Sequence, residues 1–170
     1  MLLYLGVYTP LKHRTSMALL PGVVCGSLSP LIGWLAAGAG ITEPAVWSLM
    51  VLFGLWQPPH FWLVVMAHPD DYLQRPVPSM LRVFSRMQLS RILFMWTAML
   101  GLSMLALPLA MGMASPLLYA LELANALVLI GLFGLLLLKQ TGYRVLFALL
   151  NICVFTGVLF VTVERLCGCL

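Results

Sequence analysis

Residues 45–67 read AVWSLMVLFGLWQPPHFWLVVMA and contain no Asp, Glu, Lys or Arg. An apolar run of about 20 residues is long enough to cross a bilayer as a helix. The whole chain has the same character, because 62% of its residues are hydrophobic and only 8% are charged. A soluble domain carries roughly 25% charged residues. We therefore expect an all-α integral membrane helix bundle.

Four further apolar runs have a similar length and are separated by polar or turn-forming residues. The five expected spans are residues 17–39, 45–67, 91–111, 116–138 and 145–163. A short apolar stub at residues 1–8 precedes a polar loop at 9–16, and the longest polar loop covers residues 68–90. No internal repeat or composition shift divides the chain, so the sequence predicts one transmembrane domain over residues 1–170.

Basic residues occur in three connections, which alternate with connections that lack Lys and Arg. They are Lys12, Arg14, Arg75, Arg82, Arg86, Arg91, Lys139 and Arg144. Basic connections of a membrane bundle lie on the cytoplasmic side. We therefore expect the loop at 68–90 to face the cytoplasm and the C-terminus to lie outside. The net charge of +4 is explained by this orientation, and no nucleic-acid partner is expected.

Asp70 and Asp71 stand side by side directly after the second span, in a chain with only 5 acidic residues. Carboxylates bind Mg²⁺ through oxygen, and substrate phosphates usually complete the ligand shell. Nearby Lys and Arg side chains can neutralise the remaining phosphate charge. These residues predict a diphosphate site at the membrane surface. The alternative is that the basic loops serve topology alone and that the acids are ordinary loop residues.

Pro58 and Pro59 interrupt the second span and lack the N–H groups that a helix needs, which predicts a kink or a local unwinding. Gln57 and His60 lie at helical spacing on a stripe that leads toward the acidic pair. They either bond to neighbouring helices or line a substrate cavity, and the spacing alone favours neither alternative.

Three more polar residues lie inside expected spans, namely Glu122, Asn125 and Asn151. Hydrogen bonding between helices is the simplest role for them. Cys167 and Cys169 form a C-x-C at the end of the chain, but no other residue with ligand chemistry lies nearby in sequence.

Four motifs, in order along roughly the first half of the chain, resemble one family. Residues 8–15, YTPLKHRT, resemble the Y-T-P-L-K-R-x-T loop of the protohaem IX farnesyltransferases (haem O synthases) of the UbiA prenyltransferase superfamily. Residues 26–34, GSLSPLIGW, resemble its G-A-x-P-P-x-x-G-W segment, and residues 55–61, LWQPPHF, resemble its L-W-Q-x-P-H-F. Asp71-Tyr72, with Val77-Pro78 following, resembles its D-Y-x-x-A-G-x-P.

The resemblance implies transfer of a farnesyl group from farnesyl diphosphate to a vinyl carbon of protohaem IX, within the lipid bilayer of a bacterial inner membrane. Haem would be a substrate and not a cofactor, and Mg²⁺ would hold the diphosphate. By position, Asp71 would be the main catalytic and metal-binding residue, with Asp70 in support. The expected substrate-binding residues are Lys12, Arg14, Gln57, His60, Tyr72 and Arg75.

The chain also departs from the family pattern. The family has about nine spans and a first acidic motif, N-D-x-x-D-x-x-x-D, which this sequence lacks. The chain therefore resembles the C-terminal portion only, and we expect a missing N-terminal half and little activity from the chain alone. Arg75-Pro76 replaces the usual Ala-Gly, which stiffens the loop after the acids. The alternatives are a related prenyltransferase acting on a quinone-type aromatic, or a non-catalytic membrane remnant or assembly protein.

Overall fold

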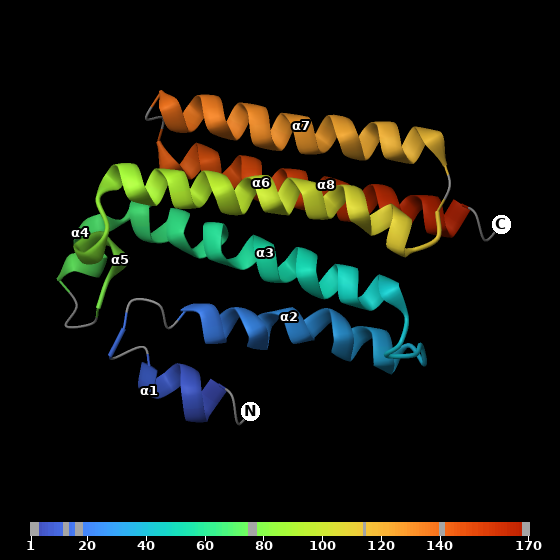
Figure 1. The fold of residues 1–170 in the computed structure, drawn as a ribbon, viewed down its shortest axis with the longest axis horizontal. Helices are drawn as coiled ribbons and strands as arrows, with labels where there is room; N and C mark the ends of the chain where they lie inside the picture. The colour runs from blue at the N-terminus through green and yellow to red at the C-terminus, as the bar shows by residue number, and fades with distance from the viewer. Residues whose placement is uncertain are drawn as a thin grey trace.

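A computed structural model describes residues 4–11, 14–15, 19–74, 78–113, 115–139 and 142–167. Five long helices lie side by side, and turns at alternate ends of the bundle connect them, as Figure 1 shows. They are α2 (Leu19–Ala36), α3 (Pro44–Ala67), α6 (Arg86–Ala110), α7 (Pro116–Leu138) and α8 (Tyr143–Cys167). All five are long and apolar enough to cross a membrane, and the described part of the chain contains no strand. The expected all-α bundle of five spans is confirmed.

The loop expected at residues 68–90 contains more helix than the sequence predicted. Two short helices, α4 (Pro69–Leu73) and α5 (Met80–Val83), lie within it, and α6 begins at Arg86 instead of residue 91. A capping box explains the early start, because Ser85 Oγ accepts from the Gln88 amide over 3.3 Å and Gln88 Oε1 accepts from the Ser85 amide over 2.9 Å. The polar loop expected from residue 9 likewise starts with a helical turn, α1 (Thr9–Leu11), after the π-helical η1 (Tyr4–Tyr8).

Helix α3 runs unbroken through Pro58 and Pro59, so the expected local unwinding does not occur. Both prolines are buried. Helix α3 packs against α2, α6 and α8, and this contact on three sides holds the segment helical although two backbone donors are missing.

The core lies where α3, α6, α7 and α8 meet, and small residues let these helices approach one another. A Cβ atom on Gly101 of α6 would lie 2.8 Å from Cδ1 of Ile130, and one on Gly157 of α8 would lie 2.7 Å from Cε of Met104. Such close approach at small residues is typical of membrane helix packing. Helix α2 contacts the rest of the bundle mainly through α3 and lies at its edge (Figure 1).

Candidate functional site

The acidic pair occupies the short helix α4, which directly follows α3. Figure 1 places α4 and α5 together at one end of the bundle. The side chains of Asp70 and Asp71 are both exposed, and neither carboxylate accepts a hydrogen bond from a described residue. Adjacent residues on a helix do not face the same direction, so the two carboxylates diverge. One of them can therefore face a bound ligand while the other points aside.

Arg82 of α5 joins this short helix to α4, which carries the two acids. Its guanidinium donates a hydrogen bond to the Leu73 carbonyl at the end of α4. Ser79 caps α5 in turn, since its Oγ accepts from the Leu81 amide over 3.3 Å. Arg82 is one of the basic residues near the acids that the sequence offers for neutralising phosphate. In the structure its guanidinium bonds the segment that carries the two acids.

Tyr72 packs against the helix that precedes it. Its ring meets the ring of Phe61 edge to face, with centroids 6.4 Å apart and an interplanar angle of 85°. This contact fixes the orientation of α4 against the last two turns of α3.

Two of the expected substrate-binding residues, Lys12 and Arg75, lie outside the described residues, as does Cys169. Arg14 is described and exposed, and its amide donates to the Leu11 carbonyl over 2.9 Å. The described residues show no ion pair between Arg14 and either acid of α4. Cys167 is an exposed free cysteine.

His60 belongs to a polar cluster that joins α3 to α8. Asn151 Oδ1 lies 2.9 Å from His60 Nδ1 and accepts from the Trp56 indole N–H over 3.1 Å. The Asn151 amide group donates to the Phe147 carbonyl over 2.6 Å. The His60 ring contacts the rings of Trp56 and Phe147, whose centroids are 4.4 and 4.7 Å from its own.

The Trp56 indole fixes the direction of the bonds in this cluster. An indole nitrogen can only donate, so the Asn151 atom that it meets must be the amide oxygen. His60 Nδ1 must then also donate to that oxygen, which assigns the proton of the neutral ring to Nδ1 and leaves Nε2 as an acceptor. The pairing of Asn151 with His60 was not anticipated from sequence. The only signal for it is that Trp56/His60 and Phe147/Asn151 are both spaced by four residues.

Gln57 faces a different neighbour. Its Nε2 donates to the Val23 carbonyl of α2 over 3.3 Å and to the Phe53 carbonyl over 3.2 Å. Gly26 leaves room for this approach, because a Cβ atom there would overlap the Gln57 amide group. Of the two alternatives for Gln57 and His60, the structure shows hydrogen bonding to neighbouring helices for both.

A second polar cluster, formed by Glu122 and Asn125, lies between α6, α7 and α8. Glu122 is 1% exposed, and neither of its oxygens has a hydrogen-bond partner in the described structure. Asn125, one turn further on, donates to the Cys153 carbonyl over 2.9 Å. Asn125 therefore joins two helices as expected, whereas Glu122 does not.

A family model described as the UbiA prenyltransferase family matches residues 1–151. This chain belongs to that family. The UbiA-family chain has curated relatives named "Protoheme IX farnesyltransferase". The relative from Geobacter sulfurreducens is 43% identical over 66% of this chain and 42% of its own length. The relative from Oleidesulfovibrio alaskensis is 34% identical over 96% of this chain and 57% of its own length.

A third relative of that name, from Mycolicibacterium smegmatis, is 36% identical over 64% of this chain and 35% of its own length. The UbiA-family chain thus spans about half the length of the curated relatives it matches. No solved structure matches it.

UbiA prenyltransferases generally use diphosphate substrates together with a metal. The described residues contain no group of three or more His, Cys, Asp or Glu side chains that could hold a metal ion. The exposed carboxylates of α4 supply the hard oxygen donors that Mg²⁺ prefers, and Mg²⁺ commonly takes only one or two carboxylates and completes its shell with phosphates and water. Carboxylate oxygens are therefore suitable ligands for Mg²⁺. The two carboxylates of α4 can fill only part of its ligand shell.

Proposed function

We propose that this protein acts in the transfer of a farnesyl group from farnesyl diphosphate to protohaem IX, which gives haem O. The observation that carries the proposal is the exposed acidic turn α4, held by Arg82 at the end of a membrane bundle in a UbiA-family chain. The three relatives described above share one name, which favours this acceptor over a quinone-type aromatic.

In this proposal the end of the bundle that carries α4 and α5 binds the diphosphate. Asp71, with Asp70 in support, would hold Mg²⁺, and this ion would stabilise the negative charge on the departing diphosphate. Lys12, Arg14 and Arg75 contribute positive charge to the same group. The allylic C–O bond breaks, and its electrons leave with the diphosphate. The π electrons of the haem vinyl group form the new C–C bond, and water then adds to the remaining carbocation and releases one proton.

The residues of α3 prepare the apolar side of the site. Gln57 and His60 are held by bonds to α2 and α8, so their rotamers are fixed before any substrate enters. Fixed side chains lose less entropy on binding than mobile ones. Tyr72 holds the acidic turn against the outer part of α3 through Phe61.

We place α4 and α5 on the cytoplasmic side of a bacterial inner membrane. The support for this orientation is that Arg82, Arg86, Arg91, Lys139 and Arg144 all lie in or beside connections at that end. The end of α8 would then lie outside. A reporter fused after Leu170 that is active only in the cytoplasm would overturn this orientation.

The proposal is tested first by binding. The chain is placed in lipid nanodiscs, and retention of farnesyl diphosphate is measured with and without Mg²⁺. We expect Mg²⁺-dependent retention that Asp71→Ala abolishes and Asp70→Ala only weakens, with membrane insertion unchanged in both. Equal retention by Asp71→Ala and the wild type would refute the assignment of Asp71.

The acceptor is tested by product mass. The chain is co-expressed with the N-terminal part of the G. sulfurreducens relative that it does not match, and supplied with farnesyl diphosphate and protohaem IX. We expect a haem product whose mass is increased by the transferred farnesyl group and the added water. We expect little of this product from the chain alone. Prenylation of a quinone-type aromatic in place of haem would contradict the proposed substrate.

A further inference from the structure

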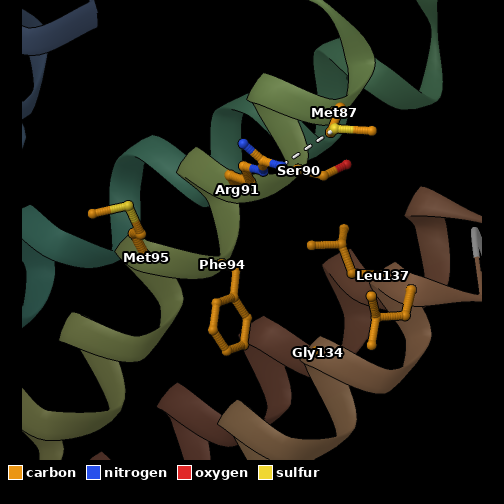
Figure 2. A pocket seen from close by; sticks show the side chains of 8 residues that line it. Met87, Ser90, Arg91, Phe94, Met95, Gly134 and Leu137 are labelled. Atoms are coloured by element: carbon orange, nitrogen blue, oxygen red, sulfur yellow. Dashed lines mark hydrogen bonds between the residues drawn. The ribbon is translucent and has the colours of Figure 1, made fainter.

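A groove opens between α6 and α7 near the end of the bundle that carries α4. Its volume is about 610 Å³, and its lining includes Met87, Phe94 and Met95 of α6 and Gly134 and Leu137 of α7. Figure 2 shows Phe94 pointing toward the α7 backbone at Gly134, with Leu137 further along the groove. The lining is almost entirely hydrocarbon and sulfur.

Gly134 keeps the groove open. A Cβ atom at this position would lie 3.0 Å from Cε2 of Phe94, so a side chain would fill the space in front of the ring. Gly131, one turn earlier on the same helix, is exposed, and a Cβ atom added there would have no neighbouring atom within 4 Å. Of the two glycines, therefore, only Gly134 lines the groove.

Arg91 is the one charged residue in the lining of this groove. Its guanidinium is exposed and approaches Met87 Sδ at 3.5 Å, as the dashed line in Figure 2 shows. Among the described residues, which include all five acids of the sequence, none forms an ion pair with Arg91. The groove thus combines an apolar floor with an unpaired positive charge at one side.

The depth of Arg91 suits a lipid headgroup. It is the sixth residue of α6, so it lies about 7–8 Å along the helix from Arg86. Long basic side chains near the ends of membrane helices extend to the headgroup level. The lining of α6 from Met87 to Met95 covers about 12 Å of helix, which is enough to hold part of an acyl chain.

We propose that the groove between α6 and α7 binds one anionic phospholipid, with its phosphate on Arg91 and an acyl chain along Phe94 and Gly134. Basic pockets between membrane helices bind anionic headgroups in this way. A prenyl diphosphate fits less well, because the lining offers no carboxylate to hold a metal and only one positive charge. The proposal rests on the groove and on insertion in a membrane, and not on the proposed reaction.

The test is native mass spectrometry of the full chain in mild detergent, mixed with phosphatidylglycerol or phosphatidylcholine of the same acyl chains. We expect about fivefold greater retention of phosphatidylglycerol. Arg91→Gln should lower that retention to the level of phosphatidylcholine. Arg144→Gln, at the same end of the bundle and outside the lining, should leave it unchanged.

The groove itself is tested by filling it. Gly134→Leu should reduce retention of both lipids, whereas Gly131→Leu should match the wild type. Because Gly134→Leu could disturb packing, circular dichroism accompanies it, and Arg91→Gln tests the proposal at an exposed residue. Equal retention of the two lipids by the wild type would overturn the proposal. So would displacement of phosphatidylglycerol by farnesyl diphosphate in the wild type but not in Arg91→Gln, because the groove would then belong to the substrate.

Discussion

The Nδ1 atom of His60 lies 2.9 Å from the Oδ1 atom of Asn151, which is 91 residues further along the chain. The same oxygen accepts the Trp56 indole N–H. One amide oxygen therefore binds two side chains of α3, and the amide nitrogen is held by the backbone of α8 at Phe147. This cluster fixes the rotation and register of α3 relative to α8.

Asn151→Leu should destabilise the bundle by about 1–2 kcal/mol, because it leaves two donors of α3 without their acceptor. The measurement is reversible unfolding in mixed detergent micelles. The neighbouring Ile152→Ala is the control, since Ile152 is 62% exposed and should cost far less. Nitrogen NMR of His60 gives a second readout, and we expect the Nδ1–H form in the wild type and a mixture in Asn151→Leu.

Gly26→Ala should displace the Gln57 side chain and break its bond to the Val23 carbonyl. We expect a loss of about 1 kcal/mol in unfolding free energy. Gly33→Ala, on the same helix with open space around it, should instead raise stability slightly, because Ala favours helix over Gly. Effects of the same sign in both variants would show that the Gly26–Gln57 contact is not important.

Glu122→Gln should not lower stability, because the carboxyl group has no partner to lose and Gln is nearly isosteric. Glu122→Lys should cost about 2–3 kcal/mol, the scale for a basic residue within a membrane span. Glu164, near the end of α8 and less buried, supplies the matched control, and Glu164→Lys should be tolerated. A marked loss of stability in Glu122→Gln would point to a bond that the carboxyl group makes.

Arg82→Ala should loosen the turn that carries the two acids, since it removes the hydrogen bond to the Leu73 carbonyl. Hydrogen exchange of the amides of α4 should rise several-fold, while exchange in the middle of α6 should not change. Arg86→Ala tests whether charge alone matters, because Arg86 is exposed at the start of α6. Similar exchange in both variants would argue against the tether.

The spans could be predicted because membrane helices follow from length and apolar composition. The fourth was predicted at its observed bounds, Pro116–Leu138, where Ser115 accepts from the Leu118 amide and caps the helix. The early start of α6 was missed although the Ser85–Gln88 capping signature was present in the sequence. Unwinding at the two prolines of α3 was predicted from the local sequence alone. The packing of α3 against three neighbouring helices outweighs the loss of two backbone donors.

The site was less predictable, because it depends on how helices are rotated against one another. The position of Asp70 and Asp71 at a helix end followed from the sequence. Their divergence followed only from the helical conformation of α4. The partner of His60 could not be predicted, since no local rule relates a residue of α3 to one of α8 when two other spans, α6 and α7, separate them in the chain.

Asn151 Oδ1 accepts hydrogen bonds from both Trp56 and His60, and this limits which groups His60 can bind. With Nδ1 committed as a donor, the only ring nitrogen of neutral His60 left for another group is Nε2, which offers a lone pair. A group that binds there must bring its own hydrogen, as water, an alcohol or an amide does. A carboxylate has no hydrogen to donate, so the neutral ring would not bind one at Nε2.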